Sequence, residues 1–143
     1  VWEEGNEALK EKTRALSETV LYPGWISEKE REALFQECSI FVLPTWFEGQ
    51  PISLLEAMAA GMCVAASAVG GIPQIMGKES DGTGILLPPK DADVLSDELI
   101  KLLKDEEQRR KMGQNARIRI INNYDVNRNV EALVEFYKEI GDY

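Results

Sequence analysis

Two glutamates that bracket a tight turn are the residues of this chain best suited to chemistry. Glu48 and Glu56 stand on either side of a Gly-Gln-Pro turn, within the segment WFEGQPISLLEAMAAG at 46–61. An apolar run precedes the turn and a helical pattern follows it, which predicts a strand, a turn and a helix N-terminus. A helix N-terminus attracts phosphate, and carboxylates beside it accept hydrogen bonds from hydroxyl groups. The segment can therefore hold a ligand that carries both groups. The spacing alone equally suits a β-to-α turn whose Glu48 is solvated and whose Glu56 lies on an exposed helix face.

The composition is that of one soluble globular domain. The chain has 143 residues, of which 44% are hydrophobic and 29% are charged, so it is long enough to bury a core without disulfides or metal. Its net charge of -9 repels phosphate backbones. We therefore expect no nucleic acid partner.

The absence of histidine removes many enzyme mechanisms. A histidine base, a Cys-His or Ser-His pair within the chain and most zinc sites are excluded. The two cysteines, Cys38 and Cys63, are flanked by apolar or small residues. They are expected to be buried free thiols in a reducing compartment.

Nothing in the sequence predicts a targeting or membrane-spanning segment. The first residues, VWEEGNEALK, resemble neither a signal peptide nor a basic presequence. The most apolar stretch, Ala57 to Val69, is broken by Gly61 and is too short to span a bilayer. We expect a cytoplasmic location.

Apolar runs and turn residues predict an alternation of strands and helices. The expected strands are Thr19 to Tyr22, Ile40 to Leu43, Cys63 to Ser67 and Ile85 to Leu87. The expected helices are Asn6 to Ser17, Ile52 to Ala60, Asp91 to Lys104, Asp105 to Asn122, and Asp125 to Ile140. A further helix is expected to begin at a capping box formed by Ser27 and Glu30 and to run through Cys38. Such alternation is typical of an α/β fold, a Rossmann-like parallel sheet with helices on both faces. Ligands bind at the carboxyl ends of the strands in such sheets.

The helix ends have recognisable signals. Asp91, Asp105 and Asp125 are expected N-caps, and Gly61 is the expected residue just past the C-terminus of its helix. In the last helix an apolar stripe recurs at helical spacing and predicts a packing face. The stripe consists of Val130, Leu133, Val134 and Tyr137.

With these turns placed, the sequence resembles the C-terminal, donor-binding half of a retaining glycosyltransferase of the GT-B architecture, in the family 4 group. The resemblance covers nearly the whole chain in order. The matching stretches are Gly24-Trp25-Ile26-Ser27, Phe41-Val42-Leu43-Pro44, Glu48 to Pro51, Leu55 to Gly61, Val69 to Pro73, Gly82-Thr83-Gly84 with Leu86, and Tyr124.

The resemblance implies a role for each residue of the turn. Glu48 would lie by the donor sugar, as the candidate catalytic residue, and Glu56 would bind the ribose hydroxyls of a nucleoside-diphosphate sugar. A carboxylate can accept from two vicinal hydroxyls together, which agrees with these roles. The other candidate substrate-binding residues are Gly49, Gln50, Pro51, Ser53, Leu54, Leu55, Gly70 and Gly71. The backbone N–H groups of residues 53–55 would face the diphosphate, and Pro51 suits the first turn of its helix. No metal or other cofactor is expected.

The chain departs from the family's pattern in two places, and Trp25 has two readings. The family has a glutamate shortly after Gly-Gly-x-Pro, where this chain has Gln74. An aromatic-glycine pair is common after the first Glu-Gly, where this chain has Gln50-Pro51 as in the polysaccharide-type members. Trp25 could approach the nucleotide base or be a partly buried core residue, and the sequence leaves both readings open.

The resemblance also implies that part of the machinery lies elsewhere. The family's arginine and lysine, which stabilise charge on the departing diphosphate, come before the point at which this chain starts. Residues 1–143 are therefore expected to be a single nucleotide-sugar-binding domain, a fragment without its N-terminal acceptor domain and first strands. Alone it would be inactive.

The implied whole protein is a retaining hexosyltransferase of bacterial polysaccharide or glycan biosynthesis, at the cytoplasmic face of the membrane or peripherally associated with it. The alternative from another class is a non-catalytic α/β interaction module that docks through the last helix. A sugar-nucleotide epimerase of similar fold is disfavoured, because the chain does not display the acid and base residues that we would expect of one.

Overall fold

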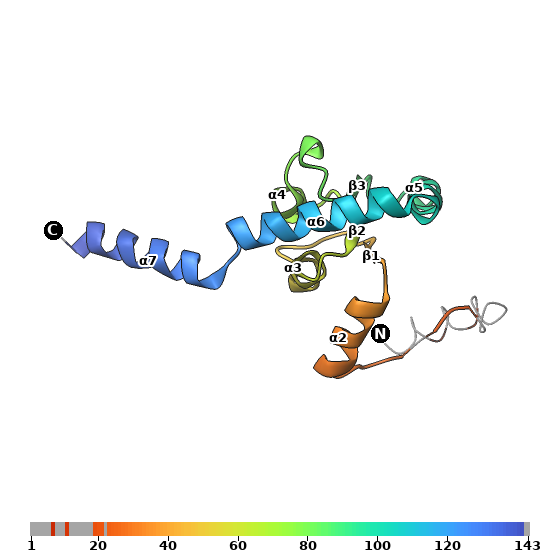
Figure 1. Cartoon of the computed structure of the whole chain (residues 1–143), viewed down its shortest axis with the longest axis horizontal. Helices are drawn as coiled ribbons and strands as arrows, with labels where there is room; N and C mark the ends of the chain where they lie inside the picture. Colours follow the sequence, from red (N-terminus) through yellow and green to blue (C-terminus); the bar gives the residue numbers. More distant parts are fainter. Residues whose placement is uncertain (1–6, 8–10, 12–18, 22, 142–143) are drawn as a thin grey trace. The chain divides into compact units, whose positions relative to one another are not determined.

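The computed structural model describes residues 7, 11, 19–21 and 23–141 (Figure 1). The chain divides into two compact units, Val1–Ala33 and Leu34–Tyr143. The sheet and all the candidate site residues belong to the second unit. The second unit is therefore the one that can hold the site.

In the first unit the predicted capping box is confirmed. The amide and the hydroxyl of Ser27 each donate to the Glu30 carboxylate at 2.7 Å, and the Glu30 amide donates back to Ser27 Oγ at 3.3 Å. These bonds favour the charged carboxylate and hold the pKa of Glu30 below its usual value. Helix α2, Glu28–Glu37, begins here and crosses into the second unit.

The strand expected in this region is not found. Residues 19–21 form no strand, because Thr19 lies in a turn and the two apolar residues after it pair with no described strand. Trp25, for which the sequence left two readings open, is fully exposed. Glu7 and Glu11 are helical, and the rest of the helix expected over 6–17, together with Tyr22, lies outside the described residues.

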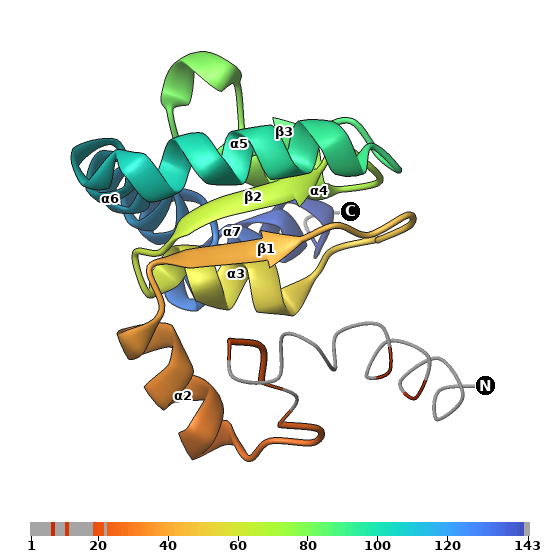
Figure 2. The ribbon, with the colours of Figure 1, turned by 90° about the vertical axis from the view of Figure 1, so that its right-hand side faces the viewer.

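The second unit is built on a parallel sheet formed by three of the four predicted strands. The strands are β1 (Ile40–Leu43), β2 (Cys63–Ser67) and β3 (Ile85–Leu87), in the spatial order β1-β2-β3. Ile40 lies opposite Cys63, and Ala65 lies opposite Ile85. Figure 2 shows β1 and β2 side by side and pointing the same way.

Helices cover both faces of this sheet, which confirms the predicted fold class. They are α3 (Ile52–Ala59), α4 (Ile72–Met76), α5 (Ala92–Lys104) and α6 (Glu106–Asn123), with a 3-10 turn, η2, at Glu79–Asp81. The last helix, α7 (Val126–Gly141), follows α6 and has no buried residue. All five residues of β2 are buried, and successive side chains point to opposite faces. Val64 and Ala66 pack with α3, α4 and α6, whereas Cys63 and Ala65 pack with α5.

The helix ends follow the predicted signals. Asp91 accepts a hydrogen bond from the Val94 amide at 3.0 Å, and Asp105 accepts one from Gln108 at 2.8 Å. Asp125 accepts from the Asn127 amide at 2.9 Å. At the end of α3, the amides of Gly61 and Met62 turn back to the carbonyls of Met58 and Ala57, with Gly61 at φ +81°. This is a Schellman ending, which fixes where the chain turns back into β2.

The apolar stripe of α7 does not pack as expected. Val130, Leu133, Val134 and Tyr137 are between 46% and 64% exposed, and α7 has no buried residue. The periodicity correctly marks the helix, but the described part of the chain does not cover its apolar face.

The two cysteines differ, so the expectation that both are buried is wrong for one of them. Cys63 is 1% exposed in the centre of β2, and its thiol donates to the Met112 sulfur at 3.8 Å. Burial raises the pKa of Cys63 to about 11, partly opposed by Arg109. Cys38 is exposed, because it follows the last residue of α2 and precedes the sheet.

We expect Cys38 alone to react with a thiol-specific reagent in the native chain at about pH 8, near the usual thiol pKa. The raised pKa of Cys63 keeps its thiol protonated there, and β2 shields it from the reagent. Absorbance titration before and after addition of denaturant measures both thiols. Rapid labelling of Cys63 in the native chain would show that β2 is not buried as described.

Candidate functional site

The candidate site lies where the three strands end. Because β1, β2 and β3 are parallel, the loops that follow them lie at the same edge of the sheet. The turn with Glu48 follows β1, and Gly70 and Gly71 follow β2. The fold thus brings together two segments that are far apart in the sequence, at the edge where parallel sheets bind ligands.

The two segments are in direct backbone contact. The Gly71 amide donates to the Gly49 carbonyl at 2.9 Å. A Cβ atom at Gly70 would overlap the Glu48 carbonyl oxygen, and one at Gly71 would overlap that of Gly49. Gly70 is also in the left-handed region, at φ +53°. No side chain larger than hydrogen fits at either position, so the pair of glycines is required by this contact.

Helix α3 begins without a side-chain cap. Its N-cap residue is Pro51, at φ −72° and ψ 113°, and Pro51 has no side-chain acceptor for the first N–H groups. The Leu54 and Leu55 amides donate to the Pro51 carbonyl, at 3.2 and 3.3 Å. Of the three amides expected to face a diphosphate, that of Ser53 is therefore the one for which no acceptor is found among the described residues.

The remaining site residues differ in accessibility. Gly49 and Gln50 are exposed, and the space beside Gly49 is open. Glu48 and Glu56 are partly buried, whereas Leu54 is a core side chain with no exposed surface. Leu54 could therefore contribute to a ligand only through its backbone.

A short helix follows the Gly-Gly turn, where the sequence predicts none. Helix α4 begins directly after Gly71, with Pro73 in its first turn, where a missing N–H costs nothing. At its far end the carbonyls of Gln74 and Ile75 need donors, because the helix has only five residues.

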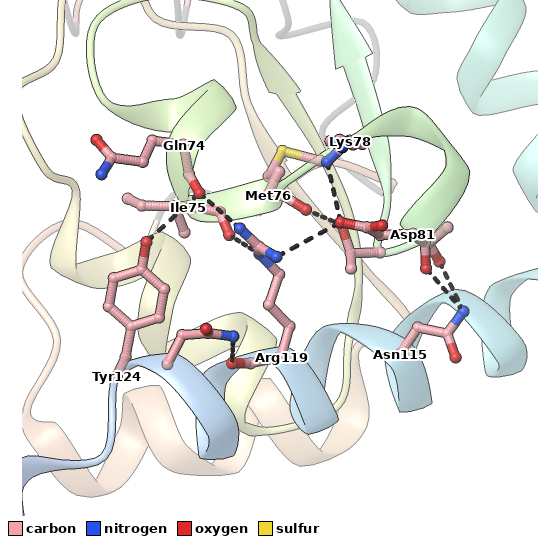
Figure 3. Close-up of polar contacts among 11 residues, drawn as sticks. Gln74, Ile75, Met76, Lys78, Asp81, Asn115, Arg119 and Tyr124 are labelled. Carbon is pink, nitrogen blue, oxygen red and sulfur yellow. Dashed lines mark hydrogen bonds and ion pairs between the residues drawn. The ribbon is translucent and has the colours of Figure 1, made fainter. Parts of the chain in front are cut away.

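Arg119 of α6 supplies these donors. Its Nε donates to the Ile75 carbonyl at 2.6 Å and its Nη2 to the Gln74 carbonyl at 2.8 Å, while its Nη1 lies 3.4 Å from the Asp81 carboxylate (Figure 3). A positive charge at a helix C-terminus also complements the helix dipole. The sequence offers no signal for this, since Arg119 is one of several charged residues on α6.

Further side chains hold the loop that follows α4. The Asn115 amide of α6 donates to the carbonyls of Asp81 and Gly82, at 3.1 and 3.3 Å, and the Thr83 hydroxyl donates to the Met76 carbonyl at 2.5 Å. Figure 3 shows Asn115 and Arg119 reaching from α6 toward α4 and the loop. The Gly-Gly turn therefore leads into α4, and side chains of α6 hold the C-terminal end of α4.

A metal site and a membrane-spanning helix find no support in the described residues, and the cavity of greater volume does not include the predicted site. This cavity, of about 530 Å³, opens between the 76–84 loop, β3, α5 and α6. None of the predicted site residues lines it. Within the described part of the chain, no three Cys, Asp or Glu side chains gather where they could hold a metal ion. None of the helices in the described ranges has the length and apolar character needed to cross a membrane.

Comparison with known proteins gives a consistent result. The family model described as glycosyl transferases group 1 matches residues 3–119. A relative from Campylobacter jejuni, N,N'-diacetylbacillosaminyl-diphospho-undecaprenol alpha-1,3-N-acetylgalactosaminyltransferase, is 34% identical over 107 residues, which are 75% of this chain. The chain spans 28% of the length of that relative.

Solved structures of glycosyltransferases with the GT-B fold are similar in three dimensions. Sucrose-phosphate synthase from Thermosynechococcus elongatus matches with a TM-score of 0.83 and 27% identity, over 95% of this chain and 33% of that one. Anabaena HepE in complex with UDP matches with a TM-score of 0.86 over 96% of this chain and 37% of that one. The second match, at 18% identity, concerns the fold alone.

We expect Arg119→Met to lower the free energy of unfolding by about 2 kcal/mol, within the range for hydrogen bonds to a charged group. The change removes the donors to α4 but keeps the stem of the side chain. Chemical denaturation measures the loss, and amide spectra should show shifts at residues 70–75. Arg110→Met, at an exposed position of the same helix, is the control. Equal stability of the two variants would mean that Arg119 does not hold α4.

Proposed function

The chain belongs to the glycosyl transferases group 1 family, and we propose that it forms the donor-binding half of a retaining enzyme. In this proposal the donor is a nucleoside-diphosphate sugar and the reaction moves a hexose to an acceptor in polysaccharide or glycan biosynthesis. The name of the Campylobacter jejuni relative refers to a lipid-linked glycan, which supports this class of acceptor. The relatives are longer than this chain, so the proposal concerns a protein that includes an acceptor-binding N-terminal domain.

One observation carries the proposal. The turn between Glu48 and Glu56 lies at the carboxyl edge of a parallel sheet, beside a Gly-Gly turn that touches it through backbone atoms alone. Two partly buried carboxylates therefore flank an open glycine and a helix start without a side-chain cap. Sugar hydroxyls and a diphosphate need these groups in combination.

The proposed roles follow from the chemistry of each group. Glu48 accepts hydrogen bonds from the donor sugar, and Glu56 accepts both vicinal hydroxyls of the ribose, because a carboxylate is an acceptor only. The open backbone at Gly49 and Gln50 approaches the sugar, and the Ser53 amide faces the diphosphate. Gly70 and Gly71 close the site from β2, and no metal takes part.

The proposed mechanism needs no protein base. In a front-face reaction the leaving diphosphate itself helps to deprotonate the acceptor, which suits a chain without histidine. Breaking the glycosidic bond requires positive charge on the departing diphosphate. In this proposal an arginine and a lysine outside residues 1–143 supply it, and the chain alone binds nucleotide without transferring sugar.

The alternative is a non-catalytic interaction module, which the uncovered apolar face of α7 favours. Val130, Leu133 and Val134 expose about half of their surface there. Nucleotide binding separates the two functions, because an interaction module has no reason to bind a nucleoside diphosphate at the turn after β1.

We expect UDP, GDP or ADP to shift the amide resonances of residues 48–56 when titrated into the isotope-labelled chain. UDP is the first to test, since HepE is solved in complex with it. The shifts should saturate and should extend to Gly70 and Gly71, because these residues touch the same turn. If none of the three nucleotides shifts these amides, the donor-binding function is wrong.

Glu56→Gln should weaken binding of the preferred nucleotide by about 1 to 3 kcal/mol, the scale of a hydrogen bond to a charged group. The amide keeps the size of the side chain but lacks the acceptor pair for two hydroxyls. Glu135→Gln on the exposed surface of α7 is the control. Isothermal titration of both variants measures the difference, and unchanged affinity in Glu56→Gln would exclude Glu56 from the ribose site.

A further inference from the structure

A second hollow lies at the carboxyl edge of the sheet, next to the turn with Glu48. It encloses about 280 Å³, and Pro44, Trp46, Ser67, Leu87, Lys90 and Leu95 are among the residues that line it. These residues come from the ends of all three strands and from the first turns of α5. Binding pockets of proteins start at roughly 300 Å³, so this hollow suits one small ring rather than a nucleotide or an oligosaccharide.

An aromatic ring and an ammonium group meet at this pocket. Trp46 is 72% exposed, and Lys90 Nζ lies 4.9 Å from the centroid of its ring. No carboxylate of the described residues pairs with Lys90. Asp91 also lines the pocket, but its Oδ1 accepts from the Val94 amide as the cap of α5. The Lys90 ammonium therefore contacts the Trp46 ring and remains available to an anion, although the chain has a net charge of -9.

The backbone at Lys90 is strained. Its φ of 64° makes it the one residue other than glycine in the left-handed region among those that the structure describes. Glycine or asparagine would adopt this conformation between β3 and α5 at lower cost. Strain of this kind persists where the surrounding structure enforces it, and it concentrates at ligand sites. Here the strained residue is the one that places a cation beside Trp46.

Ser67 adds a polar group inside the pocket. Its side chain is one of two buried polar ones in the described core, and it is 3% exposed. The other, Thr83, donates to the Met76 carbonyl. No hydrogen bond to the Ser67 hydroxyl is found among the described residues, so a ligand that enters the pocket would meet an available donor and acceptor.

These groups fit one chemical class of ligand. Pro44, Leu87 and Leu95 provide apolar walls, and Trp46 provides an exposed aromatic face for the C–H side of a sugar ring. Ser67 can bond a ring hydroxyl, and Lys90 can pair with a carboxylate or phosphate. We propose that the Trp46–Lys90 pocket binds a single sugar unit with an anionic substituent. Its use as a subsite for an acceptor glycan rests on the proposed function, whereas the binding itself does not.

Titration of the labelled 143-residue chain with three sugars tests this inference. The probes are methyl glucuronide, which carries a carboxylate, glucose 6-phosphate, which carries a phosphate, and neutral methyl glucoside. We expect an acidic sugar in the millimolar range to shift the Trp46 indole N–H and the amides of residues 87–91. The neutral sugar should bind about tenfold more weakly, because it cannot form the charged hydrogen bond. The preferred acidic probe identifies the anionic group.

Two variants locate the site. Lys90→Gly removes the ammonium and relieves the left-handed strain, so it should fold and lose the preference for acidic over neutral sugars. Trp46→Ala should weaken binding of all the sugars. The controls are Lys104→Gln, at the other end of α5, and Trp25→Ala, a tryptophan that does not line the pocket. Both controls should bind as the unchanged chain does.

The inference is wrong if no sugar shifts the Trp46 indole, or if Lys90→Gly keeps the preference for acidic sugars. The proposed function is judged separately, by the response of residues 48–56 to UDP. Nucleotide shifts without sugar shifts would overturn only the pocket. Sugar shifts without nucleotide shifts would overturn only the donor site.

Discussion

The arrangement of the site depends on a contact between two stretches of backbone. Gly70 and Gly71 lie against the Glu48–Gly49 peptide, and the Gly71 amide donates to the Gly49 carbonyl at 2.9 Å. This contact is possible because β1 and β2 are parallel neighbours, with Leu43 opposite Ala66, so that both chains leave the sheet at the same edge. The short turn after β2 then lies against the longer turn after β1.

Side chains of α6 stabilise this contact indirectly, through α4. Helix α4 continues directly from Gly71, and Arg119 and Asn115 of α6 hold the far end of that helix and its following loop. Helix α6 is in turn packed against α3 and β2 through Ala116 and Ile120. Helix α6 thus contacts both α3 and α4, the two helices that flank the Glu48 turn. These contacts hold the elements around the turn in place, although Gly49 and Gln50 are exposed.

The sequence predicts the parts of this structure that local chemistry determines. The strands appear as apolar runs because they are buried. Asp91 and Asp105 mark helix starts because their carboxylates accept from backbone amides of the first turn, and Gly61 marks a helix end because its backbone adopts a positive φ. The sequence does not predict the features that depend on contacts between residues far apart along the chain. Arg119 bonds to a carbonyl 44 residues away, and the exposure of Cys38 depends on where α2 ends relative to the sheet. The order of motifs singled out the turn between Glu48 and Glu56, whereas the Trp46–Lys90 pairing joins residues from different loops and has no sequence signature.

The glycine contact also limits how this site can change. Both sides of it are main chain, and a side chain at Gly70 or Gly71 would overlap the carbonyl of Glu48 or Gly49, so neither of these two glycines can be replaced without breaking the contact. A change of specificity in this chain can be sought at neighbouring positions whose side chains are exposed. Gln50 and Gln74, both exposed, are the natural positions for a directed-evolution library that seeks a different sugar. The glycines are the positions that such a library should leave untouched.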